Sequence, residues 1–275
     1  MKRKLTFILA GLCLVASSAV FASPEQDRKE LLKDTKLTFP KIKFDDYIYG
    51  SLAMSADAKA QYDSIMEFPP FSVDMEEGKK LWETAFKNGK TYASCFPNKA
   101  KNAAGKYPYF DDKAERVVTF ENAINDCLKA NEEPEMKYGS REMGLLTAHA
   151  KSLSDGSKVD VKVKGKGALA AYEKGKQYYY ERRGQLNFNC GTCHVNNPGK
   201  RTRSEQLSML PGQASHFPVF RDGTTLITLQ ARFKQCAKNT RMPILEYNSE
   251  EYNNLEYFMT YMSNGLKMKT PVFRK

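Results

Sequence analysis

The pentapeptide Cys190-Gly191-Thr192-Cys193-His194 places two thiols three residues apart and an imidazole directly after the second. This is the C-x-x-C-H signature for covalent attachment of c-type haem. The spacing suits two thioether bonds along one edge of a porphyrin, and it puts the next side chain under the iron. Cys190 and Cys193 are therefore predicted to bind one haem c covalently, with His194 as an axial ligand of the iron.

Two other kinds of cysteine site are less consistent with these residues. A structural zinc site needs a second Cys/His pair at similar spacing, and the remaining cysteines and histidines are not paired in that way. A thioredoxin-like redox pair needs a βαβ context, which the Tyr-rich and Asn/Gly/Lys-rich flanks do not provide. Neither alternative explains the histidine that follows the second thiol.

The N-terminus indicates export. Residues 1–22 combine three positive charges, an apolar run from Leu5 to Val20 and small residues before Ser23, which is the pattern of a cleaved signal peptide. The run is too short for a stable membrane span, and we expect no span elsewhere. The pattern predicts a periplasmic protein, in a compartment where disulfides form.

Cleavage of the signal peptide removes three positive charges from a formal net charge of +11 and leaves +8. Such a charge favours an anionic substrate or an acidic partner. Nucleic-acid binding is the general alternative for a basic chain. Export argues against it, and we find no recognition motif for it.

The elements that must position the haem motif belong to a unit that occurs twice in the chain. An offset of 109 residues aligns the two halves without gaps over a long segment. Two apolar helix faces recur, with Ser140 and Ser249 as expected N-caps and Gly156 and Gly265 as expected C′ residues. The aligned face positions are Val117, Phe120, Ile124 and Cys127 with Leu226, Leu229, Phe233 and Cys236, and Met143, Leu146, Ala150 and Leu153 with Tyr252, Leu255, Met259 and Met262.

This repeat predicts an all-α fold of tandem duplicated class-I-like cytochrome c domains, the first of which has lost its haem. Residues 23–71 show no sustained periodicity and are expected to form an arm or a partner-binding extension, so that the folded part begins near Val73. Residues 151–174 are expected to form a linker or an exposed hairpin. The predicted division is 1–22 signal peptide, 23–71 N-terminal extension, 72–158 haem-less domain and 159–275 haem-binding domain.

The first half keeps only part of the haem motif. Cys95 aligns with Cys193, but the first cysteine and the histidine are missing from residues 92–96. Without a porphyrin between Cys127 and Cys95, the helix that bears Cys127 can approach Cys95. We therefore expect a Cys95–Cys127 disulfide, which stabilises the fold by about 3 to 4 kcal/mol on the chain-entropy account.

Cys236 is then the thiol left over, on the helix face expected to cover the haem. Its sulfur is a candidate for the second axial ligand, although a lone cysteine on an apolar face is usually structural. Arg232 lies one turn before Cys236 and Arg241 five residues after it, where the first half has Ala123 and Glu132. Two arginines near one sulfur can hold a small oxyanion, and a haem propionate is the alternative partner for each of them.

These residues resemble the A subunit of the periplasmic SoxAX cytochromes of bacterial sulfur oxidation. The resemblance extends from about Val73 to Gly265. It is carried by residues 183–188, 212–218, 229–233, Cys236 and 249–252 in the second half, and by residues 94–97 and 123–127 in the first.

The resemblance implies an L-cysteine S-thiosulfotransferase, which joins thiosulfate oxidatively to a cysteine of a sulfur-carrier protein and passes two electrons to haem. It implies that Cys190 and Cys193 hold the haem and that His194 is the proximal ligand. Cys236 would be the distal ligand, found in the family as a persulfide, with Arg232 guiding the substrate. The partners would be a small haem-bearing X subunit and the carrier complex. Because Tyr92 and Phe96 depart from the two-haem pattern, the chain should be of the one-haem type.

Two other functions remain open. A simple periplasmic electron-carrier cytochrome c would use Met209, Met242 or His216 as its second axial ligand. A thiosulfate dehydrogenase would use similar haem and cysteine chemistry but would release tetrathionate and need no carrier protein.

Overall fold

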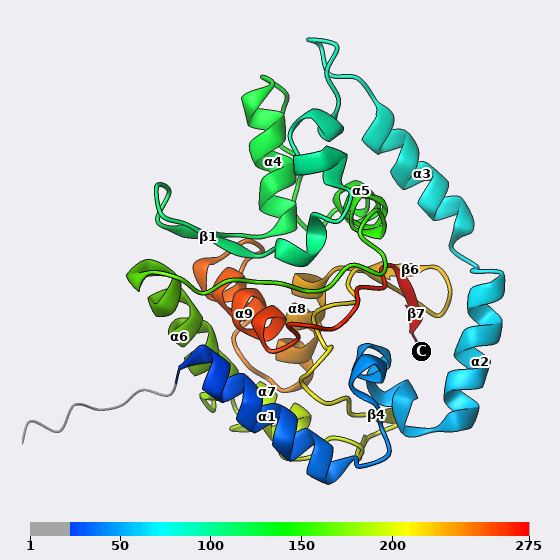
Figure 1. The fold of residues 1–275 in the computed structure, drawn as a ribbon, viewed down its shortest axis with the longest axis vertical. Helices are drawn as coiled ribbons and strands as arrows, with labels where there is room; N and C mark the ends of the chain where they lie inside the picture. Colours follow the sequence, from blue (N-terminus) through cyan, green and yellow to red (C-terminus); the bar gives the residue numbers. More distant parts are fainter. Residues whose placement is uncertain (1–22, 275) are drawn as a thin grey trace, which may run out of the picture.

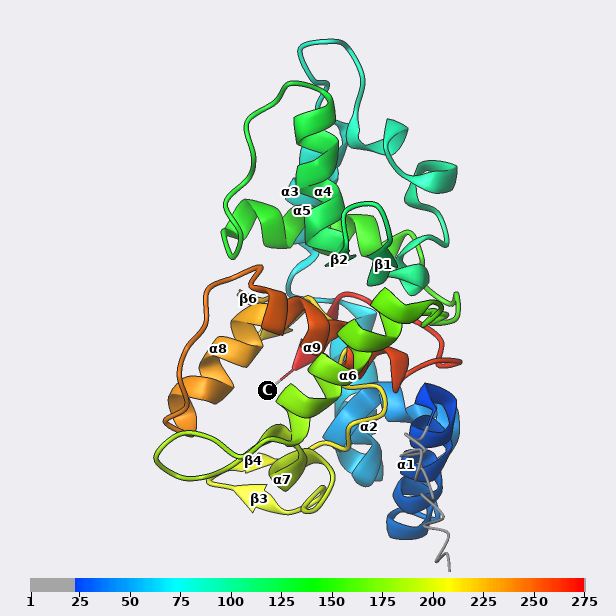
Figure 2. The same ribbon diagram turned by 90° about the vertical axis from the view of Figure 1, so that its left-hand side faces the viewer.

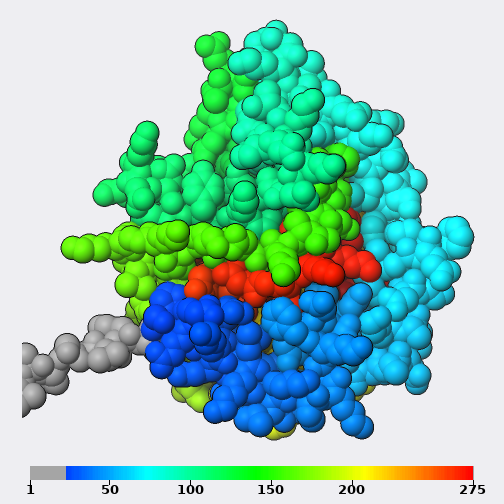
Figure 3. Space-filling model, viewed as in Figure 1, coloured from blue at the N-terminus to red at the C-terminus, as the bar shows by residue number. Residues whose placement is uncertain are grey.

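The computed structural model describes residues 23–274, so the expected signal peptide lies outside the described residues. Its elements form an upper and a lower group, with the N-terminal helices along one side of the lower group (Figure 1, Figure 2). The upper group is the first half of the chain, and the lower group is the second half. Residues between α5 and α6 cross the molecular face where the two groups meet (Figure 3).

Residues 23–71 are folded, so the expectation that folding begins near Val73 is wrong. They form α1 (Pro24–Thr38), η1 (Phe44–Met54) and α2 (Ala56–Glu67). Asp27 of α1 accepts hydrogen bonds from Tyr172 and Lys176 in the second half. The extension also contributes buried side chains to the hydrophobic clusters, namely Leu31, Ile42, Tyr47, Tyr62 and Phe71. Their spacing shows no sustained period because the segment is divided among short helices.

The first half contains α3 (Ser72–Glu83), three short 3-10 turns, a hairpin and two helices. The turns are η2 (Tyr92–Ser94), η3 (Pro97–Ala100) and η4 (Ala104–Lys106). The hairpin pairs β1 (Tyr109–Asp111) with β2 (Arg116–Val118). The helices are α4 (Phe120–Ala130) and α5 (Arg141–Ser152), whose N-caps Thr119 and Ser140 accept backbone hydrogen bonds as helix-capping residues do.

The second half has elements in a similar order. It contains α6 (Lys166–Tyr180), α7 (Cys190–His194), the hairpin β3 (Arg201–Thr202) and β4 (Glu205–Gln206), β5 (Val219–Arg221), β6 (Thr225–Ile227), α8 (Leu229–Asn239), α9 (Glu250–Tyr261) and β7 (Val272–Arg274). The strand β5 pairs with β6 in antiparallel and with β7 in parallel. The fold is therefore mainly helical, with short strands that the helical periodicity did not predict.

A glycine allows the long helices to cross closely in each half. A Cβ at Gly78 of α3 would lie 2.4 Å from the carbonyl oxygen of Leu145 in α5, and a Cβ at Gly175 of α6 would lie 2.0 Å from that of Asn254 in α9. Real Cβ atoms essentially never approach a backbone atom so closely. These crossings set how closely α3 approaches α5 in the first half and α6 approaches α9 in the second.

Three boundaries differ from the expectations, although Ser140 and Ser249 are N-caps as predicted. Gly156 and Gly265 have positive φ but lie three residues beyond the C-caps Leu153 and Met262, so they are not C′ residues. The predicted linker at 151–174 is partly wrong, since α6 begins at Lys166.

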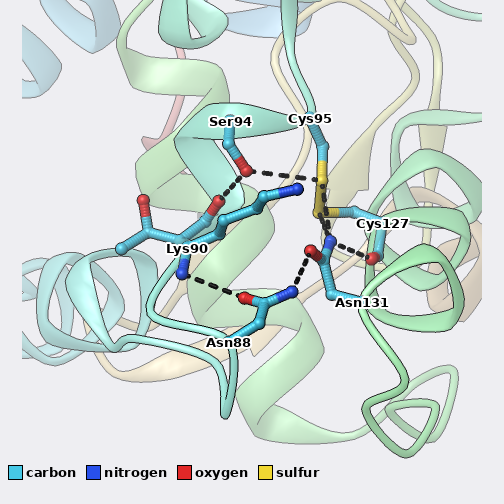
Figure 4. Close-up of a disulfide and its surroundings, with 7 residues drawn as sticks. Asn88, Lys90, Ser94, Cys95, Cys127 and Asn131 are labelled. Carbon is cyan, nitrogen blue, oxygen red and sulfur yellow. Dashed lines mark hydrogen bonds between the residues drawn. A yellow bond between two sulfur atoms is a disulfide. The ribbon is translucent and has the colours of Figure 1, made fainter.

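The predicted disulfide is confirmed, since Cys95 and Cys127 are bonded across 32 residues. The side chain of Asn131 lies against it, with Nδ2 3.4 Å from Cys95 Sγ and donating to the Cys127 carbonyl oxygen at 2.8 Å (Figure 4). Asn88 donates in turn to Asn131. The disulfide therefore joins the loop that follows α3 to α4, close to buried Phe96.

His216 lies in the core of the second half and is 5% exposed. Its Nδ1 is 2.9 Å from the carbonyl oxygen of Gly212, and its ring stacks on Phe217. Burial holds the pKa of His216 well below 6.5, and the charge of Arg274 lowers it further, although the hydrogen bond to Gly212 opposes the shift. The imidazole is thus a neutral structural group.

We expect replacement of both disulfide cysteines (Cys95→Ala with Cys127→Ala) to lower the free energy of unfolding by about 3 to 4 kcal/mol, because the unfolded chain regains the entropy of the open loop. Urea titration of the purified protein measures this difference. An unchanged midpoint would show that the disulfide does not stabilise the fold.

The buried His216 predicts a pH dependence of stability. Because its folded pKa lies below the unfolded value near 6.5, the unfolded state binds one more proton as the pH falls below that value, and stability falls with it. Below pH 6.5, the free energy of unfolding should therefore change with pH. We expect His216→Asn to reduce that change by up to about 1.4 kcal/mol per pH unit. Unfolding curves of the two proteins at several pH values test this, and parallel pH profiles would contradict it.

Candidate active site

The haem motif forms the short helix α7, which comes shortly after the end of α6. The side chain of Asn189 accepts a hydrogen bond from Thr192 N at 2.6 Å, and Thr192 Oγ1 accepts one from Asn189 N at 3.4 Å. This capping box fixes the first turn. Cys190 and Cys193 therefore lie one helical turn apart on a fixed element, and both thiols are free and half-buried.

His194 is oriented by the segment that follows the β3–β4 hairpin. Its Nδ1 lies 2.8 Å from the Ser208 carbonyl oxygen, and its own carbonyl oxygen accepts from Leu210 N at 3.1 Å. Burial lowers the pKa of His194 to about 4, with a further lowering by the charge of Arg232. The imidazole is thus neutral with its proton on Nδ1, which leaves Nε2 as the atom able to bind a metal.

Within residues 23–274, the three free thiols share one neighbourhood. Burial raises the pKa of Cys190 to about 12, and the nearby Cys236 adds to the rise. Tyr179 is fully buried, and its pKa is raised well above 10 by burial and then by Cys190, Cys193 and Cys236 among its neighbours. The structure therefore brings Cys236 of α8 into the same site as the two thiols of α7.

The side chains of α8 are less covered than those of α4 in the first half. Ile124 is fully buried and Cys127 is 3% exposed, whereas Phe233 and Cys236 at the matching positions are half-buried. An apolar surface beside two free thiols and a neutral imidazole suits a porphyrin. The residues present therefore fit a covalently attached haem.

Arg232 lies one turn before Cys236 on α8. Its Nη2 is 3.3 Å from Glu205 Oε2, and its Nη1 is 3.3 Å from Gln235 Oε1. Glu205 was not predicted from the sequence, because it lies 27 residues from Arg232 on a hairpin that the first half lacks. The extra residues of the second half in this region are the one sequence feature that could have indicated Glu205.

Arg241 is not brought into this cluster by any contact among the described residues. It lies beyond the end of α8, exposed, with a positive φ of 55°. Its carbonyl oxygen accepts a hydrogen bond from Gln185 N, which ties this loop to the one before α7. A role of Arg241 toward the substrate stays a prediction.

The other candidate ligands lie elsewhere. Met209 is 1% exposed in a cluster with Ile42, Tyr47 and Leu266. It directly follows Ser208, the partner of His194, so it is on the His194 side of the site. Met242 directly follows Arg241, in the loop tied to the one before α7. The role of Cys236 as the second axial ligand stays a prediction.

None of the helices within residues 23–274 has the length and apolar character that crossing a membrane requires. The same residues include no group of three or more His, Cys, Asp or Glu side chains that could hold a metal ion.

Comparison with known proteins identifies relatives along most of the chain. The SoxA/TsdA cytochrome c domain matches residues 77–159. The SoxA subunit of the L-cysteine S-thiosulfotransferase from Chlorobaculum tepidum is 45% identical over 86% of this chain and 83% of its own. The SoxA subunit from Allochromatium vinosum is 37% identical over 98% and 97%.

A solved structure has a similar fold. The crystal structure of SoxXA from P. pantotrophus aligns with 78% of this chain and 84% of its own, with a TM-score of 0.70 and 28% identity. Together with the sequence identities, this shows that the chain belongs to the SoxA family of L-cysteine S-thiosulfotransferase subunits.

Proposed function

We propose that this chain is the A subunit of an L-cysteine S-thiosulfotransferase, which joins thiosulfate to a cysteine of a sulfur-carrier protein. The observation that carries the proposal is the position of Cys236, whose free thiol lies in one site with the two thiols of the haem motif. An electron carrier needs the haem motif but not this third thiol. Relatives at 37% to 45% identity carry the same name.

The reaction forms one sulfur–sulfur bond. The carrier thiol and thiosulfate give a cysteine S-thiosulfonate, one proton and two electrons. The proton leaves the carrier thiol, and the electrons need an acceptor at the site. Haem c, when bound, supplies a one-electron acceptor, so the two electrons leave through it one after the other to an external acceptor.

The residues that would hold the haem are Cys190 and Cys193 by thioether bonds and His194 through Nε2. The hydrogen bond from Nδ1 to Ser208 would fix the ring and strengthen it as a ligand. Cys236 would present its sulfur from α8 as the second ligand and would be the nucleophilic sulfur of the site. We propose one haem in this chain, because the first half has a disulfide where the second has its motif.

Arg232 would bind the sulfonate end of thiosulfate. A guanidinium offers several N–H donors in one plane, which suits an oxyanion. Its position one turn from Cys236 would hold the substrate close to the reacting sulfur. Arg241, exposed beyond the end of α8, would add positive charge that attracts the anionic substrate.

We further propose that the two halves arose by duplication, with domains at residues 72–158 and 159–275. Several features recur at matching positions. Gly78 and Gly175 each face a carbonyl of the crossing helix. Glu132 and Arg241, 109 residues apart, both have positive φ. The half without the haem motif is also the one that matches the cytochrome c domain family.

The proposed setting is the periplasm, reached by cleavage of residues 1–22. The proposed partners are a small haem-bearing X subunit and the sulfur-carrier complex. The SoxXA structure, one chain of which aligns with this one at a TM-score of 0.70, supports the heterodimer.

The experiment uses the haem-loaded chain, produced in a periplasm that attaches haem together with the X subunit. Thiosulfate, an electron acceptor and the carrier protein are added, and the intact mass of the carrier is measured. We expect a gain equal to S₂O₃ on the carrier cysteine. Cys236→Ser should reduce the rate by more than about a hundredfold, with haem still attached through Cys190 and Cys193.

The same assay separates the alternatives. Tetrathionate released at an equal rate without the carrier would identify a thiosulfate dehydrogenase. Electron transfer at the wild-type rate by Cys236→Ser, without any carrier product in either protein, would identify a simple electron carrier.

A further inference from the structure

The carboxylate of Glu205 bridges two arginines. Oε2 lies 3.3 Å from Nη2 of Arg232, and Oε1 accepts a hydrogen bond from Nη2 of Arg221. The arginine side chains are only 22% and 30% exposed. Burial would raise the pKa of Glu205, but the hydrogen bonds and charges of the two arginines hold it below 4.5. The trio therefore has a net charge of about +1 at neutral pH.

Every member of this trio is confined to the half that bears the haem motif. Arg232 matches Ala123, and Arg221, the last residue of β5, matches Asp111, the last residue of β1. The chain from Cys193 to Pro218 is twelve residues longer than the chain from Cys95 to Pro108. The extra length contains the β3–β4 hairpin that presents Glu205. The trio therefore occurs only in the half with the haem motif, although both halves have similar helices.

The hairpin is held firmly on the His194 side of the site. Two hydrogen bonds join the chain before the hairpin to the chain at its end. Gly199 N donates to the Leu207 carbonyl oxygen at 2.8 Å, and Gln206 Nε2 donates to the Gly199 carbonyl oxygen at 2.9 Å. Ser208, three residues after Glu205, accepts the hydrogen bond from His194. Glu205 is therefore fixed relative to His194 on one side and to Arg232 of α8 on the other.

We propose that Glu205 is a positioning residue for the anionic substrate, which fixes the guanidinium of Arg232 beside Cys236 while Arg221 holds Glu205 from its other oxygen. The inference rests on the proposed function and names a determinant of its thiosulfate affinity. A free arginine loses much rotamer freedom when it binds an anion, and a pre-ordered one does not. Of its five N–H donors, Glu205 and Gln235 engage two, and the others stay available to thiosulfate.

The test measures thiosulfate binding to the haem-loaded heterodimer by calorimetry, without carrier so that no turnover occurs. We expect Glu205→Ala to weaken binding about tenfold, since an unfixed Arg232 must be ordered by the ligand. KM for thiosulfate should rise by a similar factor, with kcat changed less. Glu205→Gln keeps the shape and one acceptor, so its loss should be smaller.

A double-mutant comparison separates positioning from a general structural effect. In an Arg232→Ala background, Glu205→Ala should cause no further loss of affinity, because Glu205 acts through Arg232. Glu246→Ala is the matched control. Glu246 pairs at 3.6 Å with Lys234, which lies on α8 like Arg232, and the Glu246 side chain is 92% exposed. Its removal should leave both thiosulfate affinity and turnover unchanged.

Unchanged or tighter binding by Glu205→Ala would overturn the inference, as would an equal loss in the Arg232→Ala background or a wild-type protein that binds no thiosulfate. The first two of these outcomes are distinct from failure of the proposed function. Carrier product formed by Glu205→Ala with the wild-type KM for thiosulfate refutes the positioning role alone. Thiosulfate binding with the expected pattern but without carrier product refutes the transferase and leaves the positioning role standing.

Discussion

The site depends on the close crossing of α6 and α9. Gly175 meets the backbone of Asn254 so closely that no side chain fits between them. Because α7 packs against α6 and α8 packs against α9, this crossing belongs to the frame that carries both the haem motif and Cys236. The same crossing recurs between Gly78 and Leu145 in the first half. In that half, the loop after α3 and the helix α4 are joined by the Cys95–Cys127 disulfide and carry no free thiols at these positions.

The two halves show how one helical frame accommodates different interiors. The first half buries Ile124 completely and links Cys127 to Cys95. The second half leaves Phe233 and Cys236 half-buried next to the thiols of α7. It also has a hairpin that carries Glu205, the ion-pair partner of Arg232, and that is followed by Ser208, the hydrogen-bond partner of His194. The differences are concentrated where the chemistry is proposed, while the caps and the helix crossings are retained.

Local patterns predicted much of this arrangement. The haem motif, the N-cap serines and the disulfide follow from spacing within the chain and from comparison of its two halves. The folded N-terminal extension was not predicted, because its apolar residues are divided among short helices that are stabilised by packing on the second half. Glu205 was not predicted either. An ion pair between a hairpin and a distant helix leaves no periodic signal in the sequence.

The most direct test of the proposed site is the electron paramagnetic resonance spectrum of the oxidised, haem-loaded protein beside that of Cys236→Ala. We expect a low-spin signal of the thiolate-ligated type that disappears in the variant, because the sulfur of Cys236 would be bound to the iron opposite His194. A His/Met or His/His signal that the substitution leaves unchanged would contradict this. It would remove Cys236 from the iron and with it the proposed sulfur chemistry.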